Sequence, residues 1–289
     1  MKEKNNMKDT VTLNNGVKIP ALGFGTWCIP DHDAADAVKC AIRAGYRHID
    51  TAEAYENEHG VGLGVRGCGL SREEIFVTTK VRAEYKTYES AARAVDDSLS
   101  ALGLDYIDLL IIHSPQPWAE FRGEKRYFEE NREVWRAMED ALMAGKVRAI
   151  GVSNFLRDDL ESLLSVCKIR PAVNQVLAHI GNTPKDLLSF DKEHCIATEA
   201  YSPIAHGEAL KNPLIRETAE KYGVSPARLC VKYILELGMI ALPKATSEVH
   251  IRENAALDFT ISAEDMKILT DLSFRDYGEY SYFPVFSGK

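Results

Sequence analysis

The stretch IFVTTKVRAEYKTYESAARAVDDSLSALGLDYIDLLIIH (75–113) contains the unit from which this chain is built. It opens with a short apolar run at 75–80 and ends with another at 106–113, and both runs are rich in residues that favour strands. Between them, 90–103 has apolar residues at helical spacing and closes on Gly103, a common helix terminator. This order predicts two parallel strands joined by a crossover helix.

The same unit repeats along the chain. Further helical stretches cover 33–45 and 132–145, with Gly45 and Gly145 where C-terminal caps belong. The eight candidate strands are ALGFG (21–25), YRHID (46–50), IFVTTK (75–80), YIDLLIIH (106–113), VRAIGVSN (147–154), PAVNQV (171–176), IATEAYS (196–202) and MIALPK (239–244). Eight such units without a linker predict one α/β domain over 1–289, a (β/α)8 or TIM barrel.

A β-hairpin is expected ahead of the barrel. In TVTLNNGVKIP (10–20), two alternating runs flank Asn15-Gly16, a strong signal for a two-residue turn. Because the hairpin precedes the first barrel strand, we expect it to cap the barrel bottom. The stretch at 115–131 is longer than an ordinary strand-to-helix loop, and we expect it at the opposite, C-terminal face.

One glycine motif suggests a fold other than the barrel. Gly62, Gly64 and Gly67 spell G-x-G-x-x-G, a pattern typical of dinucleotide-binding folds when it directly follows a strand. Here it follows a polar, helix-like segment. We therefore interpret 57–66 as a glycine-rich helix, which is weak unless its packing requires close approach.

Composition narrows the functional classes. The net charge of −8, without a basic stripe, argues against nucleic-acid binding, and no stretch is long enough to span a membrane. The N-terminus lacks the apolar core of a secretory signal. The six cysteines show no C-x-x-C spacing and the eight histidines are scattered, so we expect reduced thiols, no metal site and a cytoplasmic protein.

Polar residues end three successive predicted strands. Asp50 ends the second, Lys80 the third and His113 the fourth, and these ends converge at the catalytic face of a barrel. A carboxylate that ends an apolar run needs a cationic partner, and Lys80 on the neighbouring strand can supply it. An ammonium near the phenol of Tyr55 would make that phenol a better proton donor. The sequence thus predicts a proton-delivery site.

Each of these residues alone has a plainer interpretation. Tyr55 alone would be a rim aromatic, Lys80 a solvated strand end and His113 a packed core residue. A Schiff-base role for Lys80 would need a neutral amine, which an ionised Asp50 opposes. Only the joint pattern favours a catalytic site.

With these residues in view, the chain resembles the aldo-keto reductases. The shared motifs, in the family's order, are HIDTAEAYENE (48–58), Lys80 in IFVTTK, LLIIHSP (109–115), GVSNF (151–155), NQV (174–176), AYSP (200–203) and PKATSEVHIREN (243–254). The match runs from the hairpin to about residue 275. The resemblance implies a barrel that binds a nicotinamide cofactor without a Rossmann fold and reversibly reduces aldehydes or ketones to alcohols.

The resemblance also implies roles for individual residues. Tyr55 would be the general acid that protonates the carbonyl oxygen. Lys80, paired with Asp50, would lower the pKa of Tyr55, and His113 would orient the carbonyl. Hydride would come from the nicotinamide ring.

Cofactor contacts are implied at several strand ends. Ser153, Asn154 and Gln175 would hold the carboxamide, Tyr201 would stack on the nicotinamide and Ser202 would contact the pyrophosphate. The full expected set is Gly25, Thr26, Trp27, Asp50, Ser153, Asn154, Gln175, Tyr201, Ser202, Lys244, Ala245, Thr246, His250, Glu253 and Asn254.

The segment expected to hold the adenosine 2′-phosphate departs from the family. After Lys244 the family usually has Ser, and here it is Ala245; six residues after it the family usually has Arg, and here it is His250. Arg offers phosphate a permanent planar charge, whereas His is at most partly charged near neutral pH. Lys244 and Thr246 remain, so NADPH is favoured and NADH use is possible.

The expected partner is a small-molecule carbonyl, bound by Trp27, Tyr55, His113 and Trp118. Small aldehydes, α-keto aldehydes and keto-sugars all remain open. The aromatic tail at 277–289 either folds over the mouth of the barrel or packs outside it. A monomer is expected. The alternative function is a slow, cofactor-binding sensor or regulatory subunit of the same fold.

Overall fold

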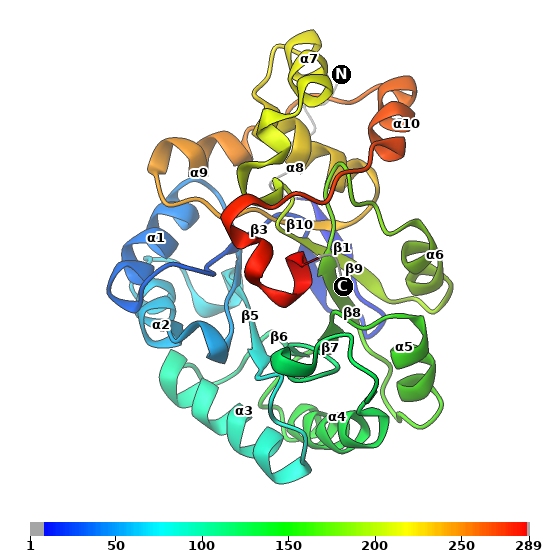
Figure 1. Cartoon of the computed structure of the whole chain (residues 1–289). Coiled ribbons are helices and arrows are strands. Elements are labelled where there is room, and N and C mark those ends of the chain that lie inside the picture. The colour runs from blue at the N-terminus through cyan, green and yellow to red at the C-terminus, as the bar shows by residue number, and fades with distance from the viewer. Residues whose placement is uncertain (1–8, 288–289) are drawn as a thin grey trace.

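The computed structural model describes residues 9–287 and confirms the (β/α)8 barrel (Figure 1). Eight parallel strands pair in chain order, and the ring closes where Leu22 bridges Ala241. The barrel strands are β3 (Gly23–Gly25), β4 (His48–Asp50), β5 (Phe76–Val81), β6 (Leu109–Ile112), β7 (Ile150–Ser153), β8 (Val173–Leu177), β9 (Ala197–Tyr201) and β10 (Ile240–Leu242). Each overlaps its predicted stretch. Residues 1–8 lie outside the described part, and with them most of the segment judged not to be a secretory signal.

Helices surround the strands (Figure 1). The α-helices are α1 (Asp31–Arg43), α2 (Glu58–Arg66), α3 (Tyr88–Leu102), α4 (Phe128–Met143), α5 (Arg157–Leu164), α6 (Lys185–Glu193), α7 (Pro213–Lys221), α8 (Pro226–Glu236), α9 (Glu248–Ala255) and α10 (Ala263–Asp271). Short 3-10 helices are η2 (Glu53–Tyr55), η3 (Arg72–Glu74), η4 (Trp118–Glu120), η5 (Ala205–Gly207), η6 (Ala209–Lys211), η7 (Gly278–Tyr282) and η8 (Pro284–Phe286). None of the described helices is long and apolar enough to cross a membrane.

Helix α3 shows how local sequence sets the boundaries. Thr87 caps its start by accepting a hydrogen bond from the backbone N–H of Ser90, and Gly103 ends it in the left-handed region at φ +61°. That conformation carries no Cβ penalty for glycine. The observed helix begins two residues before the predicted stretch at 90–103 because the cap lies further upstream.

The N-terminal hairpin closes the barrel bottom as predicted. Strands β1 (Thr10–Thr12) and β2 (Lys18–Pro20) pair antiparallel, and Asn14 Nδ2 donates to the carbonyl of Pro171 at 2.7 Å, just ahead of β8. The two-residue turn expected at Asn15-Gly16 is wrong. Leu13 N–H bonds the carbonyl of Val17, so three residues form the loop, and Gly16 takes φ +85° as a bulge.

The glycine-rich segment is a helix, as interpreted, and the glycines allow it to pack closely. A Cβ on Gly60 would lie 2.1 Å from the carbonyl oxygen of Asp31, and one on Gly62 would lie 2.0 Å from that of Leu102. Helix α2 is therefore wedged between α1 and α3 at distances that only glycine permits. Packing stabilises a helix whose propensity is poor.

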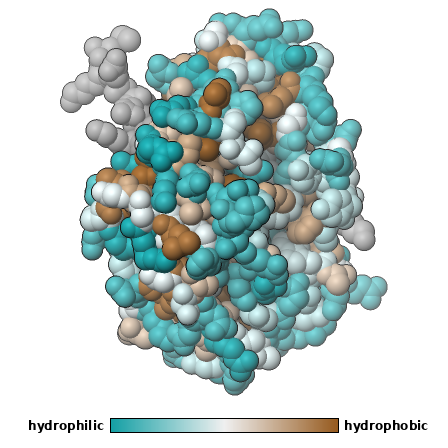
Figure 2. Space-filling model, turned by 90° about the vertical axis from the view of Figure 1, so that its left-hand side faces the viewer, coloured by the Kyte–Doolittle hydropathy of each residue, from teal (hydrophilic) through white to brown (hydrophobic). Residues whose placement is uncertain are grey.

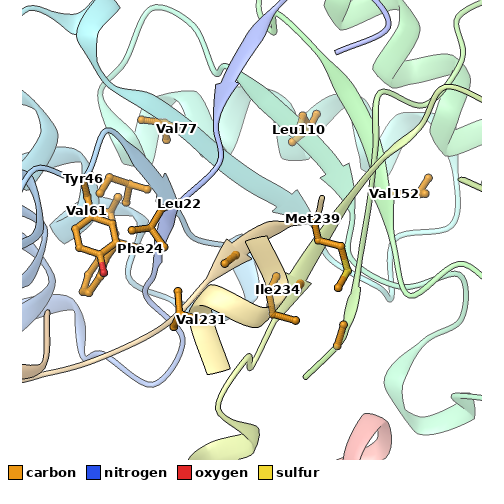
Figure 3. Packing of buried hydrophobic residues seen from close by; sticks show 14 of the residues in the cluster. Leu22, Phe24, Tyr46, Val61, Val77, Leu110, Val152, Val231, Ile234 and Met239 are labelled. Carbon is orange, nitrogen blue, oxygen red and sulfur yellow. The ribbon is translucent and has the colours of Figure 1, made fainter. Parts of the chain in front are cut away.

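Two apolar clusters hold the barrel together. The outer cluster joins strand residues such as Val77 and Leu110 to helix residues such as Val61 and Ile234 (Figure 3). The inner cluster fills the bottom of the barrel with Leu13, Ile19, Phe76, Leu109, Ile111, Ala149, Ala172, Val173, Ile240 and Leu242. Polar side chains inside the barrel are thereby confined to its middle and mouth.

Candidate active site

The carboxyl ends of the strands surround a cleft with a volume of about 390 Å³. This size is typical of small-ligand sites. Most of the site residues predicted from sequence line it: Gly25, Trp27, Asp50, Tyr55, His113, Trp118, Ser153, Asn154, Gln175, Tyr201, Ser202 and Lys244. The cleft therefore brings the expected catalytic, cofactor and substrate residues to one place.

Asp50 and Lys80 form the predicted ion pair. Lys80 Nζ donates to Asp50 Oδ1 at 2.6 Å and to the carbonyl of Thr51 at 2.7 Å, and both side chains are buried. Gln175 Nε2 donates to the other carboxylate oxygen at 2.8 Å. Lys80 lies behind the cleft wall rather than in it, so it acts on the cleft through its charge. This tight pairing also opposes the neutral amine that a Schiff base would need.

Tyr55 lies at the end of η2, above this pair. Its ring centroid is 4.9 Å from Lys80 Nζ and 5.6 Å from the centroid of His113. Burial, and then the charge of Asp50, raise the pKa of the phenol well above its usual value. The net shift is thus upward, opposite to the lowering expected from Lys80, because burial and the charge of Asp50 outweigh the ammonium 4.9 Å from the ring.

His113 is a neutral imidazole in this setting. Burial lowers its pKa well below the usual range, and the charges of Lys80 and Arg82 lower it further. Its ring packs edge-on against Tyr55 and against Trp118, at centroid distances of 5.6 and 5.2 Å. The imidazole is thus held beside the phenol without carrying a charge of its own.

The opposite wall carries amides, hydroxyls and an aromatic ring. Asn154 Oδ1 accepts from the hydroxyl of Tyr201 at 2.7 Å, and Asn154 Nδ2 donates to the carbonyl of His113 and to Ser153 Oγ, both at 3.0 Å. Within residues 9–287, the Ser153 hydroxyl accepts from Asn154 but donates to no other residue, so it can serve a ligand. Asn154 and Ser202 have φ values of +62° and +52°, a strain common at functional sites.

Thr26 does not line the cleft. Its side chain is fully buried, and both its backbone N–H and its hydroxyl donate to the carbonyl of Asp50 at 3.0 Å. Its own carbonyl accepts from Asn57 Nδ2 at 3.0 Å. Thr26 therefore fixes the end of β4, whereas its neighbours Gly25 and Trp27 reach the cleft.

The segment expected to hold adenosine lies beyond the cleft. Lys244 lines the cleft edge, while the others follow it on the loop and on α9. Thr246 and His250 are exposed, Ala245 and Glu253 are half-buried and Asn254 is buried. Ser247 caps α9 by accepting from the N–H of His250, and residues 247–250 at this helix start are exposed, so an anion could reach it.

These groups fit a nicotinamide dinucleotide. Amide and hydroxyl groups and the face of Tyr201 suit a planar carboxamide ring, and Lys244 and the start of α9 suit phosphates. Within residues 9–287, no cluster of three or more His, Cys, Asp or Glu side chains could hold a metal ion.

The aromatic tail folds over the mouth, which settles the two alternatives considered for it (Figure 1). The Phe283 ring lies 5.5 Å from that of Trp27 and 5.2 Å from that of Trp118, and Tyr280 stacks on His206 at 4.2 Å. The side of the cleft where substrate is expected is therefore lined by aromatic rings. Residues 288–289 of the tail lie outside the described part.

Glu199 and His206 are among the polar residues near the cleft that sequence analysis missed. Glu199 lies inside the barrel below Asp50 and accepts from Gln175 Nε2 at 2.9 Å; burial, and then Asp50, raise its pKa to about 8. A glutamate within the apolar run at 196–202 was the available signal. His206, whose Nε2 lies 3.1 Å from Ser202 Oγ, sits on a loop whose position the sequence does not reveal.

The barrel and the site together define an oxidoreductase that reduces carbonyl groups with a nicotinamide cofactor. The chain belongs to the aldo/keto reductase family, whose family model, described as "Aldo/keto reductase family", matches residues 21–273. It is 43% identical to a glyoxal reductase of Bacillus subtilis over 262 residues, 90% of this chain and 91% of the relative. It is also 43% identical to a 9,11-endoperoxide prostaglandin H2 reductase of Trypanosoma cruzi, with 91% of each chain covered.

Solved structures agree with this assignment. An aldo/keto reductase from Brucella melitensis superposes with a TM-score of 0.85 at 41% identity, covering 92% of this chain and 99% of that one. An aldo-keto reductase from Bombyx mori, solved in complex with NADP, gives a TM-score of 0.84 at 32% identity and covers 96% and 98% of the two chains. The sensor alternative is not favoured by these relatives.

Proposed function

We propose that this protein is an NADPH-preferring reductase of small aldehydes and ketones, with Tyr55 as the proton donor. One observation carries the proposal: Asp50, Tyr55 and His113 share one wall of a cleft, with Lys80 paired to Asp50 behind it, and the other wall offers amides and an aromatic ring. The relatives named glyoxal reductase and prostaglandin H2 reductase support this reaction class.

The chain's own residues manage the proton. A bound nicotinamide would supply the hydride. Burial and Asp50 raise the pKa of Tyr55, so the phenol is protonated at neutral pH and donates its proton as negative charge develops on the carbonyl oxygen. Lys80, 4.9 Å from the ring, stabilises the phenolate that remains, and the neutral His113 orients the carbonyl by hydrogen bonding.

The preference for NADPH is supported by Lys244 and Thr246 and by the NADP complex of the Bombyx mori relative. His250 in place of Arg predicts a weaker discrimination against NADH. The six cysteines, all free, support a reducing cytoplasmic setting. A monomer is supported on the face that carries α1, α2 and α9, where apolar residues are scattered in small groups (Figure 2).

The test follows the absorbance of NADPH, and then of NADH, against a panel of small aldehydes, with Tyr55→Phe in parallel. We expect Tyr55→Phe to lower kcat by about 10²–10⁴-fold while the dissociation constant for NADPH stays unchanged. Tyr88→Phe is the matched control, since it removes a phenol that bonds Asp140 on the outer helices. Cofactor binding by the wild type without turnover of any carbonyl would instead support the sensor alternative.

A further inference from the structure

A second cavity adjoins the active site on the side of β7 and β8. It has a volume of about 430 Å³, and Asn154, Tyr201 and Val285 line both this cavity and the active-site cleft. The loop at 115–131, the loops after β7 and β8 and the C-terminal tail all contribute to it. The adenosine segment lies elsewhere, after β10, so the cavity meets the expected cofactor path only at Asn154 and Tyr201.

Arg122 lines this cavity and forms no ion pair with the residues that the structure describes. Its guanidinium donates one hydrogen bond, to the carbonyl of Asn154 at 3.2 Å, and lies 4.7 Å from the ring centroid of Phe121. Within the described residues, no carboxylate lies at ion-pair distance from it, and the nearby Asp159 is paired with Arg126 at 2.8 Å. Burial lowers the pKa of Arg122, and the charge of the nearby Asp159 only partly offsets this shift.

Arg275 supplies a second guanidinium from the tail that follows α10. Its side chain is exposed, and it has no ion pair within residues 9–287. No Asp or Glu lines the cavity, in a chain whose net charge is −8. Two unpaired guanidinium groups on one cavity form a local positive site in an acidic protein.

The rest of the wall is apolar. Phe155, Leu187 and Val285 line it beside the arginines, and Phe155 is fully buried. A wall of this kind excludes water from an apolar body, while guanidinium groups bind oxyanions through paired, charge-assisted hydrogen bonds. Free inorganic ions would leave the apolar part unused.

We propose that this side pocket binds a small organic oxyanion, a carboxylate or phosphate on an apolar body, between Arg122 and Arg275. Benzoate and phenyl phosphate are suitable probes, because they share the apolar ring and differ in the head group. Binding is measured by equilibrium dialysis with the unliganded protein, so the result does not depend on turnover or on the proposed reductase activity.

We expect the double variant Arg122→Gln/Arg275→Gln to raise the dissociation constant of the better probe by about tenfold or more. Arg275→Gln alone should raise it several-fold; because Arg275 is exposed, this variant keeps the test decisive even if Arg122→Gln disturbs the loop. Arg157→Gln, a surface arginine paired with Glu161, and Tyr55→Phe, in the main cleft, should leave binding unchanged. Equal binding by Arg275→Gln and wild type, or loss of binding in Tyr55→Phe, would overturn the proposal.

Discussion

The two ends of the barrel use the same strands for opposite tasks. On β5, Phe76 lies in the apolar cluster at the bottom, Thr78 bonds His48 at mid-height and Lys80 forms the ion pair at the mouth. These three alternate residues point inward because side chains repeat every second position on a strand. The difference teaches that one strand can carry a buried charge at one end when the inward side chains at its other end are packed among apolar residues.

The largest effect is expected from breaking the pair at the mouth. Lys80→Met should lower kcat/KM by about 10²–10⁴-fold, because the ammonium no longer stabilises the phenolate of Tyr55. It should also destabilise the fold by about 3–5 kcal/mol, since Asp50 is left buried without its cation. Steady-state kinetics and urea unfolding measure the two effects.

The double variant Asp50→Asn/Lys80→Met separates these effects. Removing both charges should restore most of the free energy of unfolding but none of the activity. If Lys80→Met kept its turnover within about tenfold of wild type, the mouth would be a structural site and the contrast between the two ends would fail.

At the bottom of the barrel, a substitution should lower stability without lowering activity. Ile19 in β2 is fully buried in the inner cluster, so Ile19→Ala should lower the free energy of unfolding by about 2–5 kcal/mol. The kcat of the folded enzyme should stay at the wild-type value. Val17→Ala, in the same hairpin but only half-buried, should cost less, and urea unfolding compares the two. A marked loss of kcat in Ile19→Ala would show that the two ends are coupled.

Most of the mouth could be predicted from sequence, for a physical reason. Residues at strand ends, such as Asp50, Lys80 and His113, are placed by strand order and by the two-residue period alone. Arg122 and His206 sit on loops at positive φ, and their positions depend on how those loops close over the barrel. The protonation state of Glu199 could not be predicted either, because it depends on whether Lys80 pairs with Glu199 or with Asp50.

Lys80 pairs with Asp50, which leaves Glu199 without a cation, and the pH dependence of stability tests this assignment. Both carboxyls accept from Gln175 Nε2, but only Asp50 contacts Lys80. The pKa of Glu199 is raised from about 4.5 to about 8, so its contribution to stability is complete below pH 4.5 and is lost as pH rises through 8.

We therefore expect wild-type Tm to fall by more degrees between about pH 5 and about pH 9 than the Tm of Glu199→Gln. The variant keeps an acceptor for Gln175 and cannot ionise, and the difference between the two proteins cancels the titration of groups that do not contact Glu199. Parallel Tm curves for the two proteins would contradict a neutral Glu199 in the barrel.

The smallest effect is expected at the rim, where charge is exposed rather than buried. His250 lies in the first turn of α9, beyond Lys244 and Thr246, where an adenosine 2′-phosphate would bind in the proposed function. His250→Arg should raise the NADPH/NADH ratio of kcat/KM by about three- to tenfold, because a permanent planar charge replaces a partial one. Solvent screening limits the gain, which should shrink at high salt.

The kcat/KM with NADH serves as the internal control and should not change, since NADH carries no 2′-phosphate. An unchanged ratio would mean that the rim does not recognise this phosphate through His250, and that electrostatic discrimination is confined to Lys244 at the cleft edge.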